Sequence, residues 1–227
     1  MTFSLLGRCA RTGQFGAVVT TSAIGVGARC AFARAGVGAA LTQHRTDPRL
    51  GPLMIEMMGR GFSAPEALAG TVAATPHRDW RQLACIDAAG RTAAFTGALV
   101  RPAHAEAHGA DCVAIGNIMR NSEVPAAMVR AFETDPAAPL AARLLSGIAA
   151  GEAAGGEIAA VASAALLVVD RESFPFVDLR VDRHADPLGE LARLWEAYAP
   201  QAEDYVLRAV APDGAAAYVA PPPKPAA

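Results

Sequence analysis

The 227-residue sequence lacks several features that mark particular classes of protein. It has no run of basic residues longer than two and a formal net charge of −2, so the electrostatic signature of a nucleic-acid-binding protein is missing. No apolar stretch reaches the roughly 18 residues that a membrane-spanning helix needs. Residues 1–10 are too short and too polar for a secretion signal. We therefore expect a cytoplasmic protein with neither nucleic acid nor a membrane as partner.

Aromatic residues make up only 6% of the chain, whereas hydrophobic residues make up 52%. This balance predicts a core of small, closely packed side chains. The four cysteines are widely spaced and form no Cys-x-x-Cys pair, which predicts buried, reduced thiols. The Gly25-x-Gly27 bend has no third glycine and no following helix, so it is a poor nucleotide-binding fingerprint. No cofactor is expected.

Hydrophobic periodicity predicts strands in consecutive groups that are separated by pairs of helices. The expected strands are residues 2–8, 15–22, 32–43, 81–87, 92–98, 112–119, 163–170 and 176–181. The expected helices are residues 48–58, 63–74, 122–132, 140–151 and 187–198, the second of which opens with a Ser63–Glu66 capping box. This order argues against alternating βαβ units and favours an α+β sandwich of two stacked antiparallel sheets with outer helix layers. We expect a single domain over residues 1–220 and a disordered proline-rich tail over residues 221–227.

The first eight residues offer a specific chemical possibility. In an extended strand, Thr2, Ser4 and Arg8 lie on one face and Phe3 on the other. Because a small residue follows Met1, removal of Met1 would leave Thr2 with a free α-amine. The hydroxyl of an N-terminal threonine can attack a carbonyl while its amine accepts the proton. The alternative is that Thr2 simply begins a buried edge strand.

Several polar residues at the ends of expected strands are further candidates. Asn117 follows an apolar strand, where its amide can donate to a developing oxyanion; alternatively, it is a turn residue in the left-handed conformation. Ser22 ends the second strand, and Gln43 and His44 end the third, where we expect a pocket wall. The alternative for His44 is a solvent-facing position in a loop. Arg180 shares a strand face with two aspartates and can clamp a substrate carboxylate or belong to a ladder of ion pairs.

His104 and His108 have the i, i+4 spacing with which two zinc ligands share one face of a helix. Their segment is short and flanked by proline and glycine, and it lies between two expected strands. It also lacks the glutamate that zinc proteases carry directly after the first histidine. The pattern favours a solvated loop over a metal site.

Taken together, these segments resemble the bacterial "domain of unknown function 1028" family over almost the whole chain. The resemblance rests on Thr2-Phe-Ser4, Gly36-Val-Gly-Ala39 with Thr42-Gln43, Gly51-Pro52, Arg81-Gln82, Ala94-Phe-Thr-Gly97, Gly116-Asn117, Ala164-Ala-Leu-Leu-Val168 and Asp178-Leu-Arg-Val-Asp182-x-His184. That family is grouped with the N-terminal-nucleophile (Ntn) hydrolases, whose fold is a four-layer αββα sandwich. The resemblance therefore implies amide hydrolysis by an N-terminal residue, which is Thr2 in this sequence.

The resulting hypothesis is an amidohydrolase that cleaves a small-molecule or peptide-like amide. Thr2 and Asn117 are the expected catalytic residues, and the substrate site is expected to include Ser4, Ser22, Gln43, His44 and Arg180. The first alternative is a catalytically inactive binding or assembly protein of the same fold. The second is a metal-dependent hydrolase at His104 and His108. The alanine-rich helices would suit a homo-oligomer.

Overall fold

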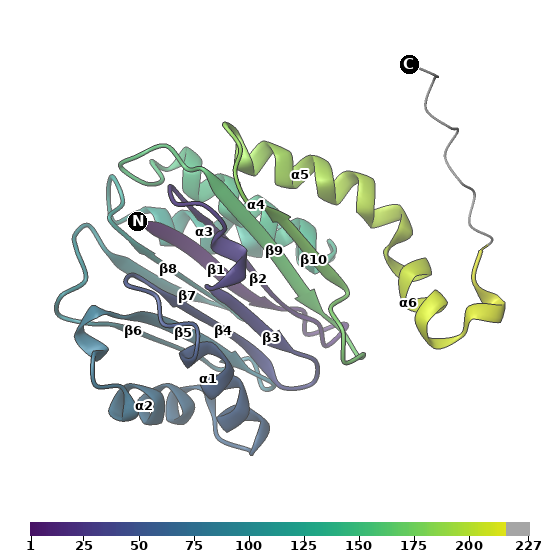
Figure 1. Ribbon diagram of the computed structural model, residues 1–227, viewed down its shortest axis with the longest axis horizontal. Helices are drawn as coiled ribbons and strands as arrows, with labels where there is room; N and C mark the ends of the chain where they lie inside the picture. Colours follow the sequence, from purple (N-terminus) through teal and green to yellow (C-terminus); the bar gives the residue numbers. More distant parts are fainter. Residues whose placement is uncertain (217–227) are drawn as a thin grey trace.

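The computed structural model describes residues 1–216, whose strands form two stacked antiparallel sheets (Figure 1). The larger sheet has the order β10 (Val177–Val181), β9 (Ser163–Val169), β2 (Phe15–Thr21), β1 (Thr2–Arg8), β8 (Cys112–Asn117) and β7 (Ala105–Gly109). The smaller sheet has the order β3 (Ala31–Arg34), β4 (Gly38–Gln43), β5 (Gln82–Asp87) and β6 (Thr92–Thr96). β1 therefore lies inside the larger sheet, where it pairs with β2 on one side and β8 on the other.

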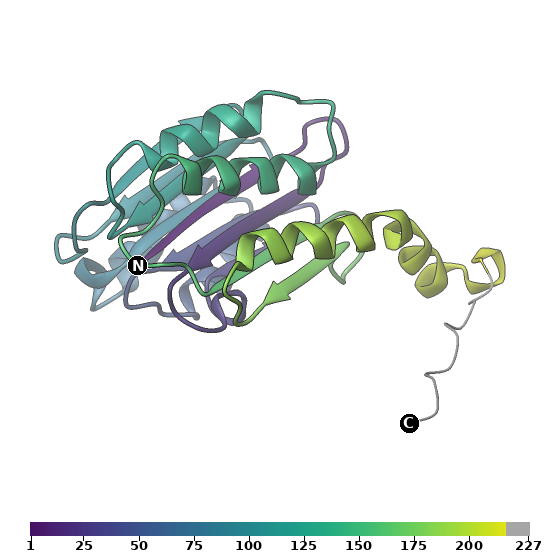
Figure 2. The ribbon, with the colours of Figure 1, turned by 90° about the horizontal axis from the view of Figure 1, so that it is seen from above.

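Helices cover the outer face of each sheet (Figures 1 and 2). The smaller sheet carries α1 (Leu50–Gly59) and α2 (Ala64–Ala74), and the larger sheet carries α3 (Val124–Glu133), α4 (Leu140–Ala153) and α5 (Pro187–Tyr198). The result is the expected four-layer αββα sandwich. A further helix, α6 (Ala202–Val210), continues from α5 beyond the end of the sheets and was not predicted from the sequence. No helix within residues 1–216 combines the length and apolarity needed to cross a bilayer.

The alternation of side chains along β1 divides the core into layers. Phe3 and Leu5 face the helices, whereas Leu6 faces the smaller sheet, as the period of a strand requires. The layer between the sheets contains many small residues, among them Ala39 and Ala84, which agrees with the composition. Small side chains allow the two sheets to pack closely.

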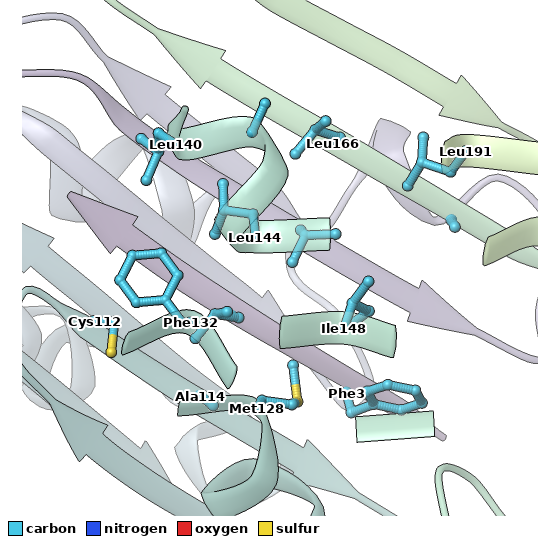
Figure 3. Close-up of a cluster of buried hydrophobic side chains, with 14 of the residues drawn as sticks. Phe3, Cys112, Ala114, Met128, Phe132, Leu140, Leu144, Ile148, Leu166 and Leu191 are labelled. Atoms are coloured by element: carbon cyan, nitrogen blue, oxygen red, sulfur yellow. The ribbon is translucent and has the colours of Figure 1, made fainter. Parts of the chain in front are cut away.

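The layer between the larger sheet and its helices holds the bulkier side chains (Figure 3). Met128 from α3 and Ile148 from α4 pack against the helix-facing side of β1 near Phe3, whereas Phe132 from α3 packs further along the strand, against Gly7. These four side chains, Phe3 included, are fully or almost fully buried. Leu191 extends the same cluster to α5. This core fixes β1 from the side opposite its polar face.

Two of the predicted elements were wrong. Residues 32–43 form two strands, β3 and β4, because residues 35–37 make a turn in which Gly36 has a positive φ of 69°. Residues 105–109 form the edge strand β7 where a loop was expected, and they pair with β8. The proposed proline-rich tail, residues 221–227, lies outside the described residues.

The predicted capping box at the start of α2 is present and gives a first testable expectation. Ser63 Oγ accepts the Glu66 N–H at 3.4 Å, and the Glu66 carboxylate accepts the Ser63 N–H at 2.8 Å. We expect Ser63→Ala to lower the free energy of unfolding by about 1 kcal/mol, since a helix N-terminal donor loses its acceptor. Urea denaturation measures the change. Ser173→Ala is the control, because Ser173 is exposed and its side chain makes no hydrogen bond within residues 1–216; equal losses in both variants would contradict the assignment.

Candidate functional site

One end of the space between the two sheets is polar, and β1 begins there. Thr2 lies opposite Asn117 on β8, and its side chain reaches Thr21 at the end of β2, with 3.3 Å between the two hydroxyl oxygens. Both hydroxyls also donate to the carbonyl oxygen of Met1. Thr2 is only 6% exposed, whereas Met1 is 37% exposed. The Thr2 hydroxyl is therefore buried and already hydrogen-bonded, whereas the residue before it reaches solvent.

Buried amide side chains connect the two sheets next to Thr2. Gln82 Oε1 accepts from Gln43 Nε2 at 2.8 Å and from Asn117 Nδ2 at 3.0 Å. Ser4 Oγ donates to Gln43 Oε1 at 2.8 Å, and Gln82 Nε2 donates to the Gly116 carbonyl at 2.9 Å. We call Ser4, Gln43, Gln82 and Asn117 the amide network. Because Ser4 and Asn117 belong to the larger sheet and the two glutamines to the smaller one, the network fixes the relative position of the sheets at this end.

Asn117 is the member of the amide network with unused hydrogen-bonding capacity. Its Oδ1 atom is buried and has no hydrogen-bond partner within residues 1–216. A buried acceptor without a donor costs about 1–3 kcal/mol. The left-handed turn conformation falls on the next residue, Ile118, with φ 54°, while Asn117 remains in the strand. The alternative of a left-handed turn asparagine is therefore wrong.

His44 lies beside the amide network at the end of β4 and is buried rather than solvent-facing. Its Nε2 accepts the Arg101 N–H at 3.4 Å, and its Nδ1 lies 2.9 Å from the Trp80 carbonyl oxygen. This pattern fits a neutral imidazole with the proton on Nδ1. Burial lowers the pKa of His44, and the positive charges around it act in the same direction. His44 itself has a positive φ of 53°.

Ser22 leads to a buried carboxylate that the sequence analysis missed. The Ser22 backbone N–H donates to both carboxylate oxygens of Glu157, at 3.2 and 3.1 Å. Glu157 is 3% exposed, and burial raises its pKa to about 7. In the sequence, Glu157 follows Gly155-Gly156, a pattern that indicates only the end of a helix. Gln82 was missed as well, although it shares with Gln43 the pattern of an inward-facing polar residue at the end of an apolar strand.

The remaining candidates lie elsewhere. Arg180 is on the edge strand β10, three positions from β1 in the sheet, and its side chain forms a two-pronged ion pair with Asp178 at 2.9 and 3.0 Å. His108 is on β7 and hydrogen-bonds Thr92, while His104 immediately precedes that strand. Four residues of extended chain span roughly 13 Å, which is too far for two ligands of one metal ion. Residues 1–216 contain no cluster of three or more His, Cys, Asp or Glu side chains that could hold a metal.

A prominent surface cavity lies away from the polar end. It has a volume of about 570 Å³ and lies beyond the opposite end of β1, where Cys9, Asp111 and Arg143 contribute to its walls. Thr2 does not line it, nor any of four further cavities of about 280–330 Å³ within residues 1–216. None of these five cavities therefore opens onto the Thr2 hydroxyl.

The raised pKa of Glu157 gives a prediction for the pH dependence of stability. An unfolded glutamate has a pKa near 4.5, so the folded protein holds this proton more tightly than the unfolded chain between that pH and about 7. The contribution of this group to the free energy of unfolding therefore falls as pH rises through this window, by an amount on the order of 2–3 kcal/mol. Glu157→Gln should remove the fall. This effect belongs to the chain that retains Met1, so both proteins are produced with methionine aminopeptidase inhibited. Urea denaturation at pH 5 and pH 7.5 then measures the difference in the free energy of unfolding between Glu157→Gln and the unsubstituted chain. The difference should shift in favour of the variant as pH rises, and a constant difference would rule the effect out.

Comparisons with known proteins agree with the architecture. The model of the DUF1028 family, described as a family of unknown function, matches residues 2–191. A crystal structure of protein SPO2555 from Silicibacter pomeroyi, assigned to the same family, superposes with a TM-score of 0.81 at 29% sequence identity. The match covers 87% of this chain and 89% of that one. Among curated proteins, none matches significantly.

Proposed function

We propose an activity for this chain, which belongs to the family of unknown function DUF1028: hydrolysis of an amide bond, with Thr2 as the N-terminal nucleophile. The observation that carries the proposal is the position of the Thr2 hydroxyl. It lies at the start of β1, at the polar end of the space between the sheets, beside Thr21 and the amide network. The substrate is a small molecule or peptide with an amide bond, as the resemblance to the Ntn hydrolases implies.

Removal of Met1 would create the reactive group and uncover it in one step. The Met1 carbonyl accepts hydrogen bonds from Thr2 and Thr21, so its loss frees both hydroxyls. Thr2 Oγ1 would then attack the substrate carbonyl carbon while the Thr2 amine takes the hydroxyl proton. The resulting ammonium would protonate the leaving nitrogen, the C–N bond would break, and a water molecule would hydrolyse the remaining ester.

Asn117 is suited to stabilise the oxyanion that forms during attack. An asparagine amide has two N–H donors, and one of them is used by Gln82 Oε1. Gln82 Oε1 also accepts from Gln43, and Gln82 in turn donates to the Gly116 carbonyl, so the amide of Asn117 is held in place before substrate arrives. A donor that is fixed in advance does not have to be reorganised in the transition state.

The other predicted site residues differ in how close they lie to Thr2, and their proposed roles differ accordingly. Ser22 and His44 follow the ends of β2 and β4 next to Thr2, where they would contact the substrate. Ser4 lies one pair further along β1 and donates to Gln43, so both would orient the amide network. Arg180 is outside this group, and its role as a carboxylate clamp stays a prediction from the sequence.

The proposal is tested by intact mass followed by covalent labelling. We expect the purified protein to lack Met1 and an acylating β-lactone probe to modify Thr2, as located by peptide mapping. A retained Met1, or label at other residues only, would overturn the proposal. That outcome would favour the alternative, a catalytically inactive binding or assembly protein with the same fold.

A further inference from the structure

Glu157 is a buried carboxylate that the proposed mechanism does not use. Within residues 1–216 it forms no ion pair, and the backbone N–H of Ser22 is the donor to both of its oxygens. A charged carboxylate out of contact with water is costly unless a cation accompanies it. Without a cation the carboxyl can avoid this cost by holding a proton, as its raised pKa indicates, and a positive charge placed beside it would allow it to ionise.

The surroundings of Glu157 show where that charge would come from. Glu157 forms a β-bridge with Met119, two residues after Asn117, and it binds Ser22, one residue after Thr21. Asn117 and Thr21 end the two strands that flank β1. The Glu157 carboxylate therefore lies between the segments that follow β2 and β8, at the end of the sandwich where β1 begins. The Met1 ammonium is already close enough to lower the pKa of Glu157.

We propose that Glu157 is the counter-ion of the α-ammonium group that Thr2 acquires when Met1 is removed. Loss of Met1 moves the chain's amine inward by one residue, roughly 3.8 Å along the backbone, from an exposed position to a buried one. Glu157 acts as a positioning residue: it orients the amine toward the Thr2 hydroxyl and stabilises the ammonium that forms when the amine takes the hydroxyl proton. This inference requires removal of Met1, as the proposed function does, but it does not require hydrolytic activity.

Two other charged residues, Glu152 and Arg120, lie near Glu157. Glu152, at the end of α4, is exposed, and its negative charge raises the pKa of Glu157. Partial burial raises the pKa of Glu152, and Arg120, on the segment after β8, opposes that rise and donates to the Ile158 carbonyl. Both are exposed and therefore screened by solvent. Glu152→Gln thus provides a matched control, with the same chemical change close by but on the surface.

The test is the pKa of the Thr2 amine, measured from the pH dependence of its acylation by an amine-selective reagent with mass-spectrometric detection. In Glu157→Gln we expect this pKa to fall by about one unit or more, because an ammonium has lost its nearest negative charge. Glu157→Asp should give a smaller fall, and Glu152→Gln should match the wild type. Circular dichroism confirms that each variant is folded. If Glu157→Gln does not fold, Glu157→Asp carries the test, since shortening the side chain must also lower the pKa.

The outcomes separate this inference from the hydrolase proposal. An unchanged amine pKa in folded Glu157 variants overturns the inference, even if the probe labels Thr2. A lowered pKa upholds it, even if the Thr2 hydroxyl never becomes acylated, in which case the hydrolase proposal alone fails. Retention of Met1 in the purified protein overturns both.

Discussion

Thr2→Ala abolishes covalent labelling of the protein by the β-lactone probe: this is the largest effect that we expect from any single substitution. The methyl group of alanine keeps the small size of residue 2 and allows Met1 to be removed, but it leaves no oxygen to attack a carbonyl. An N-terminal alanine keeps the amine, so label on residue 2 of this variant would contradict the expectation and show that the amine, not the hydroxyl, reacts with the probe. Thr2→Ser, which keeps the hydroxyl, should retain part of the labelling rate.

Thr20→Ala is the matched control for this experiment. Thr20 is a buried threonine one residue from Thr21, but its hydroxyl points to the other face of the sheet and donates to the Ser163 carbonyl at 2.8 Å. Its loss costs a hydrogen bond without touching the polar end between the sheets. We expect a less stable protein that is still labelled at Thr2. If Thr2→Ala is labelled as fast as Thr20→Ala, residue 2 is not the nucleophile.

Local patterns in the sequence predicted most of the fold. Alternation in residues 2–8 gave the face on which Thr2 lies, and the Ser63–Glu66 pair gave the start of α2, because each signal depends only on residues a few positions apart. The errors have local causes too. In residues 32–43 a single glycine turn divides an otherwise continuous apolar run, and residues 105–109 form a strand because β8 offers a hydrogen-bonding edge, which their own composition does not reveal.

The candidate site was predictable only in part, because its contacts join distant segments. Gln82 meets Asn117, 35 residues away, and Glu157 meets Ser22, 135 residues away. The sequence identified strand ends as places for polar groups, and Thr2, Asn117, Gln43 and His44 do gather at one end of the sandwich. It could not identify which strands are neighbours between the sheets. Arg180 was included for its chemistry, yet the strand order puts it on an edge.

The substitution Asn117→Ala has the second largest effect that we expect. We expect Asn117→Ala to slow acylation of Thr2 by the probe about 10²–10³-fold, the usual cost of losing one oxyanion donor, with little change in reversible binding of the probe. The reason is that the donor is needed most when negative charge has developed on the attacked carbonyl oxygen. The rate of label incorporation as a function of probe concentration separates the two effects, because binding sets the half-saturating concentration and chemistry sets the limiting rate.

Structural damage is the competing explanation, since Asn117 also donates to Gln82 Oε1 inside the amide network. Asn121→Ala controls for loss of an asparagine hydrogen bond, because Asn121 is exposed and donates to the Ala154 carbonyl at 2.8 Å, away from Thr2. Gln82→Leu controls for disruption of the network, since it removes the acceptor that holds Asn117 but leaves the Asn117 donor. If Asn117 is the oxyanion donor, the limiting rate falls further in Asn117→Ala than in Gln82→Leu at comparable stability. Equal losses would show that Asn117 matters to the packing of the two sheets and not to the reaction.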